Sequence, residues 1–217
     1  MSANPIELSL FPLNVVLFPG TVLPLHIFEP RYRQMIAECQ EHEKPFGVVL
    51  VRPDSQHLRE ETYPVGTIAE IRDLDRLADG RYTLMAVGVE RFRIIDQHHE
   101  KPYLSGLVEL YEDIPEAKQL LASSGRQAHD LFSTYLEMLL ETADKGPIQA
   151  SLPNVPEELS HFIAYFLDVP DEQKQHFLEL TSTVQRLQEE ITILRREVPF
   201  MRQMLSKSLA DDRSMLN

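Results

Sequence analysis

Apolar positions in the first half of the chain come in short runs separated by proline and glycine. Runs of this length, bounded by turn residues, are typical of β-strands. Between two of them, Asp79-Gly80 favours the positive backbone angles of a tight hairpin turn. The pattern predicts a compact, mostly antiparallel sheet or barrel. The predicted strands are residues 15–18, 22–28, 46–51, 66–72, 82–87, 89–95 and 103–111.

Helical periodicity appears once in the first half and dominates the second. Pro30 fits the first position of a helix whose apolar residues continue to Cys39 at helical spacing. Later, proline and glycine become sparse, and helices are expected around residues 120–139 and from Asn154, Pro170 and Thr181. The sequence therefore predicts an α+β protein with a β domain in residues 1–115 and a helical bundle in 116–217.

The last predicted helix carries an apolar stripe that steps by four and three residues. The stripe consists of Leu187, Ile191, Leu194, Val198, Met201 and Leu205. Such a stripe is typical of bundle core. The alternative is a seam for a partner helix, which would make the protein a homodimer through its last helix.

The net charge of this 217-residue chain is −13, with −7 in residues 1–115 and −6 in residues 116–217. Because an acid excess spread in this way repels phosphate groups, it argues against nucleic acid and anionic membranes as partners. RNA binding stays an alternative only through a local basic patch in the β half. That patch would be Arg72, Arg76, Arg81, Arg91 and Arg93.

The stretch from Leu8 to Phe28 has no charged residue, yet Pro12, Pro19 and Pro24 would each break a membrane-spanning helix. We therefore interpret it as an extended, buried segment with turns at the prolines. The only cysteine, Cys39, excludes an intramolecular disulfide and suits a cytoplasmic location.

Sequence motifs for catalysis are missing. There is no GxxxxGK[ST] phosphate loop, no GxSxG nucleophile elbow and no HExxH pair. His98 and His99 are adjacent, so in an extended strand they would point to opposite sides and would not share a metal ion. We expect no cofactor, no metal site and no enzymatic activity.

Several motifs are specific enough to carry a family resemblance. In the first half they are Leu10-Phe11-Pro12-Leu13, Val16-Leu17-Phe18-Pro19-Gly20, Leu23-Pro24-Leu25-His26-Ile27-Phe28-Glu29-Pro30-Arg31-Tyr32-Arg33, Phe46-Gly47-Val48-Val49-Leu50, Val65-Gly66-Thr67-Ile68-Ala69-Glu70-Ile71, Asp79-Gly80-Arg81-Tyr82 and Gly88-Val89-Glu90-Arg91-Phe92-Arg93-Ile94. In the second half they are Pro156-Glu157-Glu158-Leu159-Ser160, Lys174-Gln175-His176-Phe177-Leu178-Glu179 and Arg186-Leu187. The chain resembles the amino-terminal substrate-binding domain of Lon proteases.

This resemblance implies a PUA-like β domain followed by a helical bundle. In Lon proteases the module precedes an ATPase domain and a Ser–Lys protease domain, and it helps to recognise unfolded or tagged polypeptides. The chain is similar to a stand-alone relative, and we expect it to bind polypeptides without ATP and without catalysis.

The prolines in the amino-terminal segment prevent continuous strand pairing, so its large apolar side chains are candidates for a binding surface. A cleft between sheet and bundle, with an apolar floor and a charged rim, would hold an extended peptide. The candidate residues are Phe11, Phe18, His26, Phe28, Glu29, Arg31, Tyr32 and Arg33. Two alternatives stay open: the aromatic residues are core, or His26, Glu29 and Tyr32 form a small-ligand or hydrolase pocket.

Overall fold

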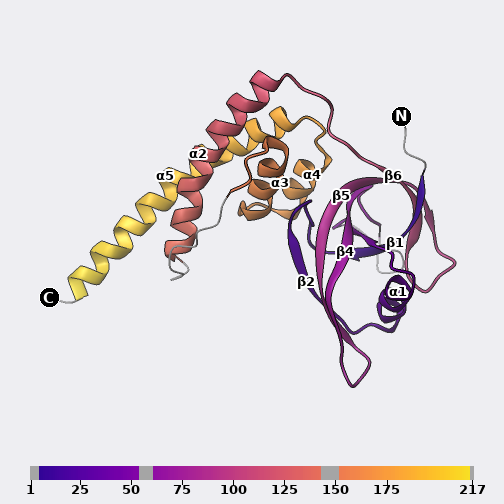
Figure 1. Ribbon diagram of the computed structural model, residues 1–217. Coiled ribbons are helices and arrows are strands. Elements are labelled where there is room, and N and C mark those ends of the chain that lie inside the picture. Colours follow the sequence, from indigo (N-terminus) through magenta and orange to yellow (C-terminus); the bar gives the residue numbers. More distant parts are fainter. Residues whose placement is uncertain (1–4, 54–60, 143–151, 216–217) are drawn as a thin grey trace. The chain divides into compact units, whose positions relative to one another are not determined.

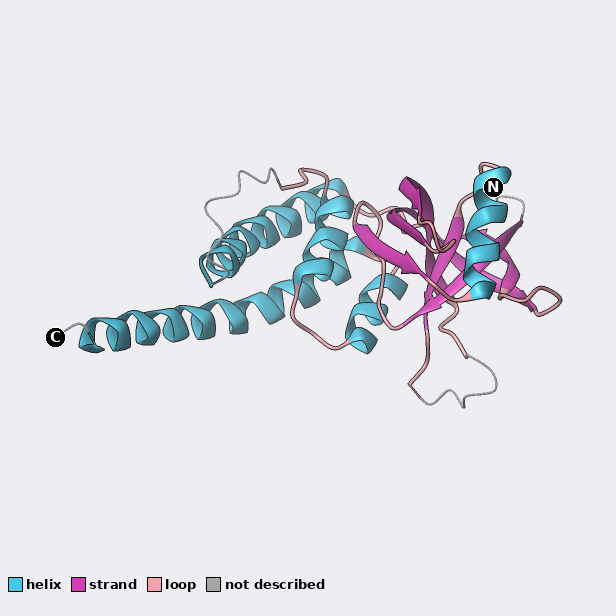
Figure 2. Cartoon of the chain, turned by 90° about the horizontal axis from the view of Figure 1, so that it is seen from below, coloured by secondary structure: helices cyan, strands magenta, loops and turns pink. Residues whose placement is uncertain are grey.

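The structure is a computed structural model that describes residues 5–53, 61–142 and 152–215. Six strands and one helix come first, and four helices follow, which confirms the α+β class (Figures 1 and 2). The strands are β1 (Ile6–Leu13), β2 (Val22–Ile27), β3 (Phe46–Leu50), β4 (Val65–Arg76), β5 (Tyr82–His98) and β6 (Ser105–Leu110). The helices are α1 (Pro30–Glu41), α2 (Lys118–Thr142), α3 (Pro156–Phe166), α4 (Asp171–Glu179) and α5 (Thr183–Met215). None of the helices described is both long and apolar enough to cross a bilayer.

The sheet has the strand order β2-β5-β4-β3-β1-β6, and a further pairing between β5 and β6 closes five of these strands into a ring. All neighbours are antiparallel except β1 and β3, which run parallel. β5 is long enough to pair with β2 near its start and with β6 near its end. As a result β2 lies outside the ring and is an edge strand.

Gly47 and Gly66 make room for the side chain of Phe92 inside the closed set of five strands. A Cβ atom at Gly47 would lie 2.6 Å from Cζ of Phe92, and one at Gly66 would lie 2.4 Å from the backbone oxygen of Val48. Phe92 is fully buried in a cluster with apolar side chains from four other strands. The close packing around the Phe92 side chain is possible because Gly47 and Gly66 carry no Cβ atom.

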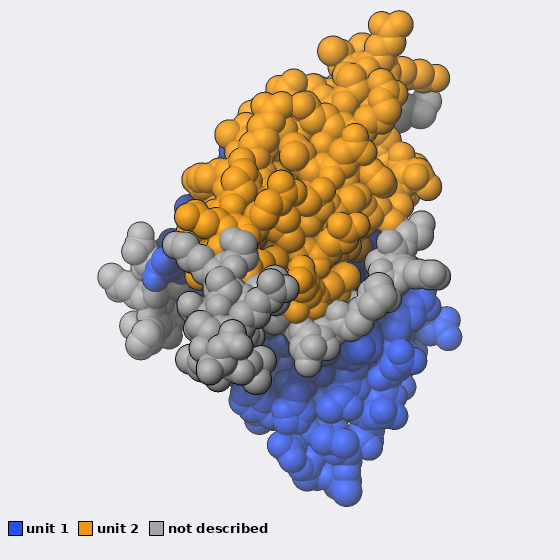
Figure 3. Space-filling model, turned by 90° about the vertical axis from the view of Figure 1, so that its left-hand side faces the viewer, with its two compact units in different colours: residues 1–113, 164–181 blue, residues 114–163, 182–217 orange. Residues whose placement is uncertain are grey.

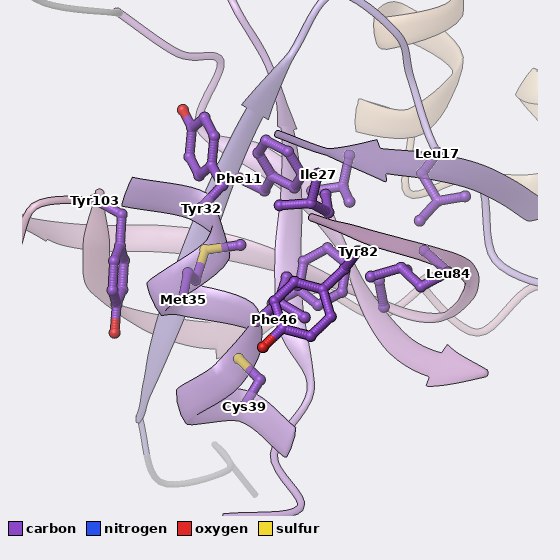
Figure 4. Packing of buried hydrophobic residues seen from close by; sticks show 14 residues of the cluster. Phe11, Leu17, Ile27, Tyr32, Met35, Cys39, Phe46, Tyr82, Leu84 and Tyr103 are labelled. Carbon is purple, nitrogen blue, oxygen red and sulfur yellow. The ribbon is translucent and has the colours of Figure 1, made fainter. Parts of the chain in front are cut away.

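The larger apolar cluster lies where α1 packs on the sheet. Figure 4 shows Met35 and Cys39 of α1 beside Phe46, Tyr82 and their neighbours from the strands. This cluster accounts for the helical spacing of the apolar residues after Pro30. It anchors α1 directly after the edge strand β2.

The chain divides into two compact units, coloured separately in Figure 3. Unit 1 comprises residues 1–113 and 164–181, and unit 2 comprises residues 114–163 and 182–217. The expected division into 1–115 and 116–217 stays a prediction, but these units differ from it because α4 belongs with the β domain.

Long-range hydrogen bonds, all buried or partly buried, explain the placement of α4 in unit 1. Nη1 of Arg91 donates to the carbonyl oxygens of Leu178 and Leu180, each at 2.7 Å. Nε2 of Gln175 donates to the carbonyl oxygen of Val65 at 3.0 Å, and the Tyr111 hydroxyl donates to the carbonyl oxygen of Glu179 at 3.1 Å. These partners lie far apart in sequence, so the chain pattern does not reveal them.

In unit 2, helices α2, α3 and α5 share a core that includes the predicted residues Leu187, Ile191, Leu194 and Val198 of α5. The carboxylate of Glu116 accepts hydrogen bonds from the Ser182 hydroxyl and from the backbone N–H of Val184. Both donors lie at the start of α5, where backbone N–H groups lack helical partners.

Two details of the strand prediction were wrong. The run from Val15 to Phe18 is not a strand, because the chain turns there and the Thr21 hydroxyl donates to the carbonyl oxygen of Phe18 at 2.8 Å. Val16, Leu17 and Phe18 are buried, whereas Val15 is exposed. Residues 82–87 and 89–95 form one strand that passes through Gly88. A side chain at Gly88 would collide with the backbone oxygen of Phe18, 2.3 Å from the Cβ position.

Candidate functional site

The edge strand β2 alternates between the interior and the surface. Leu23, Leu25 and Ile27 pack toward the core, whereas Val22, Pro24 and His26 are exposed. Because successive side chains of a strand point to opposite faces, the exposed set forms one row. A proline is tolerated here because β2 pairs on one side only.

Phe28 continues this row beyond the end of the strand, with 60% of its surface exposed. Its ring centroid lies 6.1 Å from that of His26. On the neighbouring strand, Met85 lies directly opposite Pro24 and is 38% exposed. We call Val22, Pro24, His26, Phe28 and Met85 the edge patch.

Three of the predicted site residues are core instead. Phe11, Phe18 and Tyr32 are buried, at 5%, 0% and 4% exposure. The ring centroids of Phe11 and Tyr32 are 4.2 Å apart, inside the cluster between α1 and the sheet (Figure 4). The physical reason for Phe11 and Tyr32 is that α1, which carries Tyr32, packs on the sheet and covers both rings. Phe18 lies at a turn whose backbone packs closely against Gly88.

The charged candidates divide into a pair and a separate arginine. Nε of Arg31 donates to the carboxylate of Glu29 at 3.0 Å, and the guanidinium of Arg31 lies 4.4 Å from the ring centroid of Tyr32. Arg33 lies against Gly80 of the β4–β5 hairpin and lines a pocket of about 350 Å³ together with Arg76.

The small-ligand alternative needed His26, Glu29 and Tyr32 at one site. The structure places them in three different environments: His26 is exposed beside Phe28, Glu29 is paired with Arg31, and Tyr32 is core. Within the described ranges, no group of three or more His, Cys, Asp or Glu side chains is positioned to hold a metal ion.

The basic patch that kept RNA binding open is neutralised by acids in four of its five members. Arg72 pairs with Glu70, Arg81 with Asp79, Arg91 with Asp113 and Arg93 with Glu109. Arg91 is also buried. An arginine that is already paired has little to offer a phosphate backbone.

A second polar cluster ties α1 to the loop before β6. The Glu38 carboxylate accepts hydrogen bonds from the Tyr103 hydroxyl and from Nζ of Lys101, the latter at 3.1 Å. The hydrogen bond from Tyr103 is the main reason that the pKa of Glu38 falls to about 2. Beside it, burial raises the pKa of the Cys39 thiol, so this cysteine is a poor nucleophile.

Sequence reasoning missed Met85 as part of the edge patch and Arg76 as the neighbour of Arg33. Met85 sits in a run of apolar residues whose alternation does not say which face is outside. Arg76 comes near Arg33 because the β4–β5 hairpin lies against α1, and no local sequence pattern indicates this contact.

Comparison with known proteins gives a consistent result. The model of the ATP-dependent protease La (LON) substrate-binding domain matches residues 7–196. The chain is 28% identical over 197 residues to Lon protease 2 of Myxococcus xanthus and 32% identical over 196 residues to the Lon protease of Paraburkholderia phytofirmans. These matches cover 89% and 86% of this chain but only 24% of either relative.

Solved structures agree on the fold. A Lon N-terminal domain protein from Xanthomonas campestris aligns with a TM-score of 0.65 at 24% identity, covering 86% of this chain and 98% of the other. The N-terminal domain of the Mycobacterium avium complex Lon protease aligns with a TM-score of 0.61 at 20% identity, covering 88% and 98%. With the family model matched over most of its length, this chain belongs to the Lon substrate-binding domain family.

Proposed function

We propose that this protein binds unfolded or tagged polypeptide segments through the edge patch, in the cytoplasm, without ATP and without catalysing a reaction. The family description supports binding of protein substrates. The chain spans about a quarter of the length of the curated Lon proteases it matches, and the matching family model describes substrate binding rather than peptide hydrolysis.

The observation that carries the proposal is the exposure of Phe28 beside His26 and the edge strand. Large apolar side chains gathered on a surface mark places where a partner packs. Aromatic rings dominate such interfaces because they bury much area and lose little side-chain freedom. The charged pair Glu29–Arg31 follows directly and gives the patch a polar rim.

Docking of side chains fits this edge better than addition of a strand. The N–H of Gly88 donates to the carbonyl oxygen of Thr21 at 2.9 Å, and backbone groups alternate along an antiparallel strand. Residue 24 therefore directs its backbone toward the open edge, where Pro24 has no N–H to donate. A row interrupted in this way is a poor template for an added strand.

Binding to a permanently unfolded protein tests the proposal. Labelled, reduced and carbamidomethylated α-lactalbumin is titrated with the full chain in the absence of nucleotide, and fluorescence anisotropy is recorded. We expect saturable binding that weakens about fivefold or more when Phe28→Ser and Met85→Ser are combined.

The matched control is Ile95→Ser, since Ile95 is an apolar residue of β5 outside the edge patch whose exposed fraction lies between those of Met85 and Phe28. Its affinity should equal that of the parent protein. Equal affinity of the patch variant and the control would contradict the proposal, as would binding that requires ATP.

We also propose that the protein forms a homodimer through α5. Phe200 and Met204 of this helix are 58% and 56% exposed, which leaves apolar surface for a second copy. Light scattering after size-exclusion chromatography tests this: the parent chain should elute as a dimer, and Phe200→Ser with Met204→Ser should elute as a monomer. A monomeric parent chain contradicts it.

A further inference from the structure

A pocket in unit 1 carries two arginines and no acid. It lies between α1 and the β4–β5 hairpin and has a volume of about 350 Å³. Its lining includes Pro30, Arg33, Ala37, Arg76, Gly80 and Tyr82. In a chain with a net charge of −13, a pocket whose charged lining residues are both arginines differs from the average surface.

Arg33 is held in this pocket by the shape of the hairpin. Gly80 has a φ of +81°, and a Cβ atom there would lie 2.2 Å from Nη2 of Arg33. The guanidinium therefore lies directly on the bare backbone of the turn. The guanidinium of Arg76 lies 5.9 Å from the ring centroid of Tyr82, a pocket residue that is its partner across the hairpin.

The carboxylates that flank the pocket are already engaged elsewhere. Glu29 pairs with Arg31 at 3.0 Å, and Asp79 pairs with Arg81 at 2.7 Å. Asp75 precedes Arg76 on β4, so its side chain points to the other face of the sheet. Neither Arg33 nor Arg76 makes an ion pair with a carboxylate in the described part of the chain, which leaves two guanidinium groups for an external anion.

The pocket is next to the edge patch. Pro30 lines it and is only two residues after Phe28, and Tyr82 lies opposite Ile27 at the end of β2. An extended chain advances about 3.3 Å per residue. A ligand that packs an apolar side chain on Phe28 therefore brings groups within about four residues of it to the arginines.

We propose that Arg33 and Arg76 bind a carboxylate of the client polypeptide, so that the preferred segment combines an apolar side chain with an acidic group a few residues away. This rests on the proposed function and narrows its substrate class. Guanidinium groups bind carboxylates through paired N–H donors, which gives direction as well as attraction. The pocket then fixes the register of a segment that the apolar patch alone would hold loosely.

Short amidated peptides labelled with tetramethylrhodamine test this. Each has a central Phe-Leu, and they differ only in carrying Glu or Gln three residues away. A third peptide carries Gln and is not amidated, so that its terminal carboxylate lies at the same spacing. It distinguishes recognition of an acidic side chain from recognition of a chain end. Anisotropy titrations use the full chain, the double variant Arg33→Gln with Arg76→Gln, and Arg202→Gln as a control that removes an exposed charge of α5.

The parent chain should bind the Glu peptide about fivefold more tightly than the Gln peptide at low salt, and added salt should reduce this ratio. The double variant should bind the Glu and Gln peptides equally, with an unchanged affinity for the Gln peptide. Arg202→Gln should keep the preference for the Glu peptide. Equal binding of both peptides by the parent chain overturns the inference and leaves the proposed function intact. Absence of binding by every peptide and by the unfolded protein overturns both.

An RNA of similar length is titrated in parallel. If it binds more tightly than the Glu peptide and depends on the same two arginines, the pocket is a phosphate site and the inference is wrong. Gly80→Ala gives an independent readout, because it displaces Arg33 without removing a charge. It should reduce the preference for Glu over Gln in the same direction as the double variant.

Discussion

The hydroxyl of Tyr103 donates a hydrogen bond to the carboxylate of Glu38, and this bond joins the loop before β6 to α1. Lys101 donates to the same carboxylate and to the Tyr103 oxygen, at 3.1 Å and 2.8 Å. These contacts hold α1 against the loop that precedes β6. They also make the stability of the protein depend on pH.

The pKa of Glu38 is lowered from 4.5 to about 2 in the folded protein, chiefly by the hydrogen bond from Tyr103. The ionised carboxylate therefore stabilises the fold above pH 4.5, and this contribution is lost as the pH falls toward 2. Glu38→Gln should lower the free energy of unfolding by about 1 kcal/mol at neutral pH. The difference from the parent protein should vanish on acidification.

Urea unfolding curves recorded from neutral pH down to about pH 2 measure this difference. Glu90→Gln serves as the control, since Glu90 is exposed and makes no side-chain hydrogen bond with a described residue. A constant gap between Glu38→Gln and the parent at every pH would contradict the role of the ionised carboxylate.

The buried guanidinium of Arg91 should be the most sensitive charge in unit 1. Arg91→Met removes the donors to the carbonyl oxygens of Leu178 and Leu180 and breaks the ion pair between Arg91 and Asp113. We expect a loss of about 3 kcal/mol in the free energy of unfolding. The matched control Arg93→Met, at an exposed ion pair with Glu109, should cost less than about 1 kcal/mol. Similar losses in both variants would show that the buried guanidinium of Arg91 does not hold α4 in unit 1.

Substitutions at Gly66 and Gly20 distinguish the free-energy cost of a steric clash from that of a strained backbone conformation. Gly66→Ala places a Cβ atom 2.4 Å from the backbone oxygen of Val48, so we expect a loss of about 3 kcal/mol or failure to fold. Gly20→Ala meets nothing within 4 Å but has a φ of +77°, so its cost should be only about 1 kcal/mol. Chemical denaturation measures the free energy of unfolding of both variants. A larger loss for Gly20→Ala than for Gly66→Ala would contradict the close packing around Gly66.

Tyr32 and Phe28 are both candidate binding residues from the sequence, but Tyr32 is buried and Phe28 is exposed. Their substitution should therefore have opposite effects on stability and on client binding. Tyr32→Ala removes a core ring that packs against the ring of Phe11, and we expect a loss of about 3–5 kcal/mol in the free energy of unfolding. Phe28→Ala should leave the melting temperature within a few degrees of the parent protein and reduce client binding. Differential scanning fluorimetry distinguishes them, and strong destabilisation by Phe28→Ala would show that Phe28 is structural.

The elements that local chemistry controls were predictable. Asp79-Gly80 makes the expected hairpin turn, with Gly80 at a positive φ and its N–H bonded to the carbonyl oxygen of Leu77. Pro30 begins a helix whose apolar face is buried as its spacing indicates. In each case the turn or helix is decided by neighbours in sequence.

What sequence reasoning missed depends on contacts between distant segments. The segment from Val22 to Phe28 has apolar residues on both faces, so alternation alone does not say whether Phe28 or Ile27 is buried. The helix α1 decides this by covering one face. In the same way, α4 joins the β domain through Arg91, more than eighty residues earlier.

Photo-cross-linking from the edge patch tests the central claim most directly. A benzoylphenylalanine is placed at position 26 or, as the control, at position 95, and the protein is irradiated with unfolded α-lactalbumin in the absence of nucleotide. We expect cross-linked client from position 26 and little from position 95. Equal yields from both positions, or cross-links from position 95 alone, would show that the edge patch does not bind the client.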